Sequence, residues 1–215
     1  CIAPDYIVVN NHVKDELISM LKKNIISTFG STPIKSDSYG RIINTNNLLR
    51  LKENLINQNI EFGGKIDEKN LYVEPTLVID PDVNSEIMKE EIFGPILPIL
   101  SYENENDLEK ILDANPSPLA FYIFSKNQKF IDKLINSNKF GGCVVNDTLI
   151  HFVNSNLPFG GIGPSGMGAY RGKFSFDTFT HYKPVLEKKS MIDLPLRYGP
   201  YPSSFNFIKK ILEKI

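Results

Sequence analysis

The 215-residue sequence contains no tryptophan and only two cysteines, Cys1 and Cys143. Two cysteines are too few for a disulfide framework, and such sparse use is typical of proteins from a reducing compartment. No apolar run approaches the roughly 20 residues that a membrane-spanning helix needs. The formal net charge is only -1, which argues against nucleic acid as a partner. We therefore expect a cytoplasmic globular protein.

The three histidines, His12, His151 and His181, have no metal-ligand spacing, so no metal site is predicted. The run GIGPSG at 161–166 formally matches the dinucleotide-binding pattern G-x-G-x-x-G. That pattern must follow a strand and open a long helix, whereas this run follows LPFG and contains a proline. We expect extended chain rather than a helix after Arg171. The sequence therefore predicts a tight, rigid loop here.

Strand-like and helix-like segments alternate along most of the chain. Apolar residues recur every four positions from Val13 to Phe29, which predicts one face of a helix that ends at Gly30. Pro75 indicates an edge or a boundary within the strand-like run 72–79. Strands are also expected at 6–9, 96–102, 119–124 and 143–145. Helices are expected at 45–57, 107–114 and 128–136, and a short turn or helix at 85–91. This spacing predicts an α/β fold with a largely parallel sheet and flanking helices.

The predicted helix at 45–57 has an apolar face made by Leu48, Leu51, Leu55 and Ile56. Three parts of the chain are then expected. Residues 1–177 form the α/β domain, residues 178–202 form an extended segment, and residues 203–215 form an amphipathic tail.

Cys1 precedes a short buried strand, and strand ends are where sites gather in α/β proteins. A lone cysteine is more often a small core residue, and a nucleophilic one needs a lowered pKa and a nearby base or dipole. Two partners stay open as the base. One is His151, and the other is the α-amino group of Cys1 itself, as in amidohydrolases with an N-terminal cysteine. The amidohydrolase hypothesis predicts stacked sheets of mostly antiparallel strands.

The run EEIFGP at 90–95 places two carboxylates before an aromatic residue and a Gly-Pro turn. Adjacent carboxylates are most often a solvated pair. The functional alternative is a rigid ledge, on which a carboxylate accepts hydrogen bonds from ribose hydroxyls while the aromatic ring covers an apolar cofactor face.

Several blocks, in order and across nearly all of the chain, resemble the class 3 type of the aldehyde dehydrogenase family. They are CIAPDY at 1–6, DSYGRIIN at 37–44, EEIFGPILP at 90–98, LAFYIFS at 119–125, GGCVVND at 141–147, LPFGGIGPSGMGAYR at 157–171 and SFDTFTH at 175–181. Each block is weak alone, and their combination is specific.

The resemblance implies that the Cys1 thiolate attacks an aldehyde to give a thiohemiacetal. Hydride transfer to NAD or NADP then leaves a thioester, and water releases the carboxylic acid. It further implies that Glu91 binds the nicotinamide ribose, that Phe93 packs near the nicotinamide and that Phe159 lines the substrate tunnel. Residues 180–188, within the expected extended segment at 178–202, resemble the strand through which such enzymes form homodimers.

The resemblance starts at the catalytic cysteine. We therefore expect the Rossmann cofactor domain to be absent from this chain, and the 215 residues to be inactive by themselves. The non-enzymatic alternative is a truncated module that only dimerises. Two roles stay open for the tail: packing against the protein body or a partner subunit, and weak attachment to a membrane surface.

Overall fold

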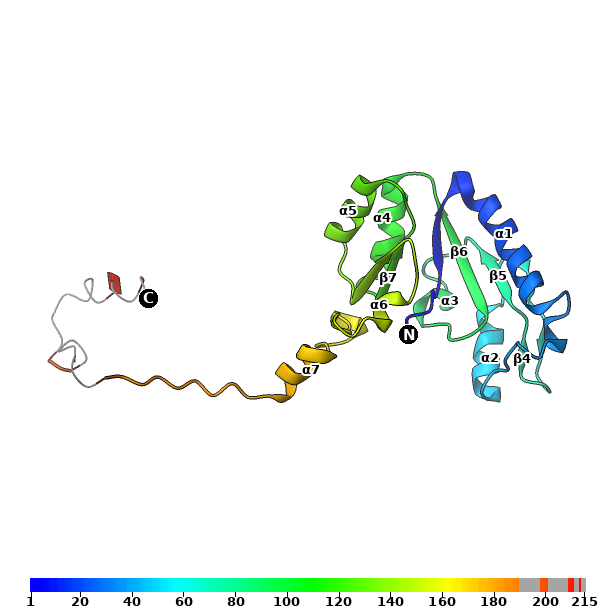
Figure 1. The fold of residues 1–215 in the computed structure, drawn as a ribbon. Helices are drawn as coiled ribbons and strands as arrows, with labels where there is room; N and C mark the ends of the chain where they lie inside the picture. Colours follow the sequence, from blue (N-terminus) through cyan, green and yellow to red (C-terminus); the bar gives the residue numbers. More distant parts are fainter. Residues whose placement is uncertain (190–197, 201–208, 211–212, 214–215) are drawn as a thin grey trace. The chain divides into compact units, whose positions relative to one another are not determined.

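The computed structural model describes residues 1–189, 198–200, 209–210 and 213. It divides into two compact units, Cys1–Phe179 and Thr180–Ile215 (Figure 1). The expected amphipathic tail at 203–215 falls mostly outside the described residues, so its helix stays a prediction. Within the described residues, no helix is both long enough and apolar enough to cross a membrane.

A four-stranded sheet in the order β1-β6-β5-β2 is the centre of the first unit. β6 pairs in parallel with both β1 and β5, and β2 pairs antiparallel with β5 at the edge. A parallel pair, β7-β8, and an antiparallel pair, β3-β4, stand beside it. The bounds are β1 (Ile7–Asn10), β2 (Ile60–Phe62), β3 (Ile66–Asp67), β4 (Tyr72–Val73), β5 (Thr76–Ile79), β6 (Ile96–Tyr102), β7 (Ala120–Ile123) and β8 (Gly142–Val145).

The helices connect these strands in the expected alternation, which confirms an α/β fold with a largely parallel sheet. The stacked antiparallel sheets that the amidohydrolase hypothesis requires are not what these strands form. The helices are α1 (Asn11–Phe29), α2 (Thr45–Asn54), α3 (Glu86–Lys89), α4 (Glu105–Ala114), α5 (Gln128–Ser137), α6 (Ile150–Val153) and α7 (Gly172–Phe179), with 3-10 turns at Pro33–Lys35 and Gly163–Ser165.

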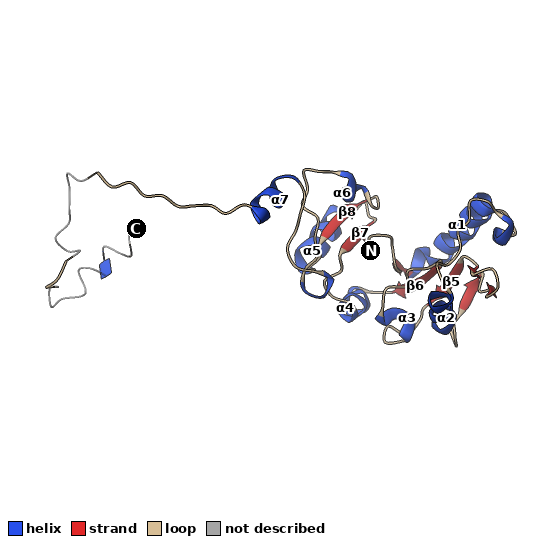
Figure 2. Cartoon of the chain, turned by 90° about the horizontal axis from the view of Figure 1, so that it is seen from below, coloured by secondary structure: helices blue, strands red, loops and turns tan. Residues whose placement is uncertain are grey.

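Both faces of the four-stranded sheet are covered, with α1 on one and α2 and α3 on the other (Figure 2). Successive side chains along a strand point to opposite faces of the sheet, so each strand contributes to the packing on both faces. In β5 and β6, Leu77, Ile79 and Ile99 pack with α1, whereas Val78 and Leu100 pack in the cluster that holds α2 and α3. The central strands are therefore apolar on both sides, as parallel strands generally are.

Pro75 marks a boundary rather than an edge, because β4 ends before it and β5 begins after it in an interior position. The prediction for α2 was too long. The helix ends at Asn54, and Ile56 is 60% exposed rather than part of the apolar face. The chain turns there, with Asn57 in the left-handed region at φ 58°.

The expectation of extended chain directly after Arg171 was wrong. The eight-residue helix α7 follows it and includes Thr178 and Phe179. Arg171 itself adopts φ 100°, and its backbone N–H donates to the Ser175 hydroxyl at 2.7 Å, inside the first turn of the helix. A side-chain hydrogen bond of this kind starts a helix without a strong apolar repeat.

Candidate active site

Cys1 lies six residues before β1, and its side chain is exposed. Because β1 and β6 are parallel, their amino ends lie at the same end of the sheet. The EEIFGP run leads directly into the amino end of β6, so the segment that holds Glu91 and Phe93 and the segment that begins with Cys1 enter the sheet from the same end. Ligands of open parallel sheets usually lie at the carboxyl ends. The Cys1 segment and the EEIFGP run instead lie at the opposite end, before the amino ends of β1 and β6.

A direct hydrogen bond joins the two segments. The Asp5 carboxylate accepts from the Ile92 backbone N–H at 3.0 Å, across 87 positions of sequence. Burial raises the pKa of Asp5, and the nearby Glu91 charge adds to this, while the Ile92 bond and Arg50 act in the other direction. The nucleophile segment and the EEIFGP turn are therefore held as one unit.

A second bond holds the other end of the nucleophile segment. The Tyr122 hydroxyl, on β7, donates to the Ile2 carbonyl oxygen at 2.6 Å. Burial raises the pKa of Tyr122, and a backbone hydrogen bond from Leu149 opposes that shift. Leu149 precedes α6 with φ 65°. One hydroxyl thus ties the residue after Cys1 to the turn that begins α6.

His151 packs against Tyr122 and makes no hydrogen bond with Cys1. It is 8% exposed, and its ring meets the Tyr122 ring edge-on with centroids 5.9 Å apart. Within the described part of the chain, neither ring nitrogen has a hydrogen-bond partner. Burial lowers the pKa of His151, and the Arg171 charge lowers it further. The ring packs against Gly142, where a Cβ would come within 2.7 Å of it.

Phe159 belongs to an aromatic cluster whose members contact His151. Its backbone pairs with Tyr170 through two hydrogen bonds of 3.0 Å, and its ring meets those of Phe152 and Tyr170 edge-on at 5.0 and 5.7 Å. The Arg171 guanidinium lies 4.1 Å from the Phe152 ring centroid and donates to the Phe152 carbonyl oxygen. Contacts from Tyr122 through His151 thus connect the Cys1 segment to Phe159.

Glu91 and Phe93 suit the role of a ledge for a flat cofactor. Glu91 is exposed, so both of its carboxylate oxygens can accept from ligand hydroxyls. Phe93 is 63% exposed and adopts φ 45°, which is uncommon outside glycine. Between them, Ile92 is 2% exposed and anchors the turn in the core. An exposed carboxylate and an exposed ring on an anchored turn are what one wall of such a site requires.

Cys143 differs from Cys1 in its surroundings. It lies in β8, partly buried, and burial raises the pKa of its thiol. A raised pKa leaves less of the reactive thiolate at neutral pH. Of the two cysteines, Cys1 is the candidate nucleophile.

The glycine-rich run at 161–166 forms a tight loop, as predicted, and not a phosphate-binding turn. A Cβ on Gly161 would lie 2.0 Å from the Ser165 carbonyl oxygen, and one on Gly160 would lie 2.0 Å from that of Gly168. The backbone therefore folds against itself at distances that only glycine allows. The loop includes only the three-residue turn Gly163–Ser165.

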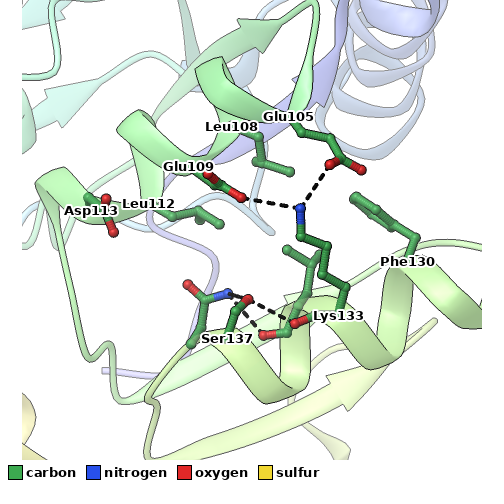
Figure 3. A pocket seen from close by; sticks show the side chains of 10 residues that line it. Glu105, Leu108, Glu109, Leu112, Asp113, Phe130, Lys133 and Ser137 are labelled. Carbon is green, nitrogen blue, oxygen red and sulfur yellow. Dashed lines mark hydrogen bonds and ion pairs between the residues drawn. The ribbon is translucent and has the colours of Figure 1, made fainter.

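Other features of the described residues do not compete with this site. No three His, Cys, Asp or Glu side chains in the described ranges gather as metal ligands. A cavity of about 170 Å³ lies between α4 and α5 (Figure 3). It is smaller than ordinary ligand sites, and its Lys133 is paired with Glu105 and Glu109 at 2.8 and 3.2 Å.

Asp5, Tyr122 and Arg50 had no assigned role in the sequence interpretation. Arg50, on α2, donates to the carbonyl oxygens of Ile92 at 2.6 Å and Glu91 at 3.3 Å. Asp5 offered one signal, since an acidic residue directly before a buried strand needs a partner. The sequence gives no such signal for Tyr122, because an aromatic residue is common in a strand.

Comparison with known proteins identifies a family and a shared fold. The model of the aldehyde dehydrogenase family matches residues 1–185. The 4,4'-diaponeurosporen-aldehyde dehydrogenase of Staphylococcus aureus is 45% identical over 97% of this chain and 46% of its own length. The aldehyde dehydrogenase family 3 member A2 of Rattus norvegicus is 45% identical over 95% of this chain and 43% of its own.

Among solved structures, the substrate-bound state of Staphylococcus aureus AldH has a TM-score of 0.84 and 44% identity, covering 98% of this chain and 46% of that one. The Mycobacterium tuberculosis aldehyde dehydrogenase complexed with NAD+ shares the fold, with a TM-score of 0.73 at 24% identity over 90% of this chain and 41% of that one. The chain spans about half the length of the relatives it matches.

Proposed function

Because this chain belongs to the aldehyde dehydrogenase family, we propose that its residues form the thiol-bearing part of an enzyme that oxidises an aldehyde to the carboxylic acid with NAD or NADP. One observation carries the proposal. The segment that begins with the exposed Cys1 is joined to the Glu91–Phe93 turn by the Asp5–Ile92 hydrogen bond.

The chemistry assigned to these residues follows from their types. The Cys1 thiolate forms a bond to the aldehyde carbon, giving a thiohemiacetal whose oxyanion the Cys1 backbone N–H helps to stabilise. A nicotinamide cofactor, when bound, accepts the hydride from that carbon. The carbon is thereby oxidised to a thioester, which water cleaves to release the acid and restore the thiol.

The other residues bind and orient. Glu91 accepts hydrogen bonds from the nicotinamide ribose hydroxyls, and Phe93 covers the apolar face of the ring. Phe159 lines the path of the aldehyde. We further propose that the 215 residues alone do not turn over substrate, because they provide one wall of the cofactor site. The complete enzyme acts as a homodimer to which residues 178–202 contribute.

The test is Cys1→Ser in the full natural polypeptide that contains this chain. Oxidation of an aldehyde should fall by at least about 1,000-fold, because a serine hydroxyl is a far poorer nucleophile without a strong base. Cofactor affinity should stay within about twofold. Cys143→Ser is the matched control and should retain near-normal turnover. Substantial aldehyde oxidation by the Cys1→Ser variant would refute the proposal.

A further inference from the structure

The Ile92 peptide groups are held from two sides. The Asp5 carboxylate accepts from the Ile92 N–H at 3.0 Å, and the Arg50 guanidinium donates to the Ile92 carbonyl oxygen at 2.6 Å. Arg50 also donates to the Glu91 carbonyl oxygen at 3.3 Å. Three hydrogen bonds from two charged side chains thus converge on two adjacent residues. Bonds to charged groups are stronger than neutral ones, so the turn has little freedom to shift.

Ile92 is buried in the core, so the hydrogen bonds with Asp5 and Arg50 act on a residue that is already fixed by packing. Its side chain is 2% exposed and packs in the cluster with Leu48 and Leu51 of α2, the helix that also carries Arg50. The residues on either side, Glu91 and Phe93, are exposed. Phe93 has φ 45°, a conformation that persists only where the surroundings impose it. Holding Ile92 therefore fixes where both exposed side chains point.

Asp5 links this turn to the thiol. It lies four residues after Cys1 in the same segment, so the two Cα atoms are at most about 14 Å apart. The Ile2 carbonyl, next to Cys1, is itself held by Tyr122 at 2.6 Å. The segment is thus anchored near its start and at Asp5, and the second anchor is the Glu91–Phe93 turn.

We propose that Asp5, with Arg50, is a positioning residue that sets the distance between the Cys1 thiol and the cofactor ring by clamping the Ile92 peptide groups. This inference rests on the proposed function and deepens it, because it names the residues that hold the Cys1 thiol and the cofactor ring at a fixed distance. A displacement of about 1 Å between reacting groups can cost roughly 100-fold in rate. The clamp acts through geometry, and a neutral acceptor of the same shape replaces Asp5.

The experiment compares Asp5→Ala, Asp5→Asn and Asp80→Ala in the full natural polypeptide. In Asp5→Ala, kcat should fall about 10- to 100-fold, the KM for the cofactor should rise several-fold, and exchange of the Ile92 amide hydrogen should speed up at least about tenfold. In Asp5→Asn, kcat, KM and Ile92 exchange should lie within about threefold of the values of the unmodified enzyme, because the amide oxygen still accepts from the Ile92 N–H.

Asp80 supplies the matched control. It also accepts a backbone N–H, from Ser101 at 2.6 Å, but at the carboxyl ends of β5 and β6, away from Cys1. Asp80→Ala should leave kcat and Ile92 exchange unchanged. If Asp5→Ala does not fold, Arg50→Met removes the carbonyl-side bonds and keeps the Asp5 bond, so it should show a similar loss in kcat with a smaller increase in Ile92 exchange.

Ile92 exchange separates the two proposals. If the unmodified polypeptide oxidises no aldehyde, the proposed function fails, and faster Ile92 exchange in Asp5→Ala that Asp5→Asn reverses still supports the clamp. Ile92 protection that is unchanged in Asp5→Ala overturns the clamp whatever the activity. So does a folded Asp5→Asn variant as impaired as Asp5→Ala, since charge rather than position would then be the requirement.

Discussion

Glu90 and Glu91 are adjacent, exposed and chemically identical, so their positions alone distinguish their roles. Glu90 ends α3 with extended backbone, at φ -128° and ψ 156°. Glu91 neighbours the clamped Ile92, and successive side chains in extended backbone point in opposite directions. The two carboxylates therefore cannot share one role, and the EEIFGP motif resemblance is what assigns the cofactor ribose to Glu91.

Glu91→Gln keeps the size of the side chain but replaces one acceptor oxygen with a donor. In the complete enzyme, we expect the hydride-transfer rate to fall roughly 10- to 100-fold, because the nicotinamide ring is less well placed. Cofactor affinity should change less. The isotope effect with deuterated aldehyde should grow as hydride transfer becomes rate-limiting. Glu90→Gln should be tolerated, and the reverse pattern would show that the ribose-binding residue is Glu90.

Tyr122→Phe tests the other anchor of the nucleophile segment. The change removes the bond to the Ile2 carbonyl and the bond from the Leu149 backbone N–H, and leaves the ring against His151. Unfolding free energy should drop by about 1–3 kcal/mol, as expected for two hydrogen bonds. Turnover should fall roughly tenfold because the Cys1 backbone is less fixed.

The matched control for Tyr122 is Tyr39, whose hydroxyl donates to the Val73 carbonyl oxygen at 2.7 Å, between segments remote from Cys1 in sequence. Tyr39→Phe should cost similar stability and leave kcat unchanged, as measured by denaturant unfolding and steady-state kinetics. Equal loss of kcat in both variants would mean that the Tyr122 bond is merely structural.

At the scale of elements, apolar periodicity predicted which helices exist but misplaced several ends. α1 begins at Asn11 rather than Val13 because the Asn10 side chain accepts the His12 N–H at 3.0 Å. α4 begins at Glu105 because Asn104 caps it in the same way. Polar caps extend a helix beyond its apolar stripe, so an apolar repeat alone starts it too late.

The loop at 157–172 shows an element whose conformation depends on glycine. Gly161→Ala would bring a Cβ within 2.0 Å of the Ser165 carbonyl oxygen, so the backbone has to move. We expect a destabilisation of about 1–3 kcal/mol and faster proteolysis within the loop, which also carries Phe159. Gly40→Ala is the control, because nothing lies within 4 Å of its Cβ position. Unchanged proteolysis of the Gly161→Ala variant would contradict this account.

At the scale of the whole molecule, the fold class followed from the alternation of strands and helices, and the family followed from ordered motifs. The contacts that build the site did not follow from either. Asp5 meets Ile92 across 87 positions and Tyr122 meets Ile2 across 120. Local patterns carry no information on such pairs, because tertiary packing brings segments together that are distant in sequence. The roles of Cys1, Glu91, Phe93 and Phe159 stay predictions for kinetics to test.

The second unit, Thr180–Ile215, is where the homodimer is predicted to form. Large apolar side chains are exposed along its described start, with Val185 78% and Leu186 93% exposed. Exposed apolar residues grouped along one segment mark an interaction surface. Because the first unit has its own cores, its folding should not need the second.

Two deletions in the full natural polypeptide separate the roles of this unit. Removing residues 180–215 should leave a monomer whose first unit unfolds within a few degrees of the original temperature, since about 1 kcal/mol shifts such a midpoint by only about 2–4 °C. Removing residues 203–215 alone should leave the dimer intact, because the extended segment at 178–202 is the part expected to pair. Sedimentation velocity and calorimetry measure both, and co-sedimentation with anionic vesicles shows whether the tail also attaches to membrane. A dimer that survives loss of residues 180–215 would place the interface outside the second unit.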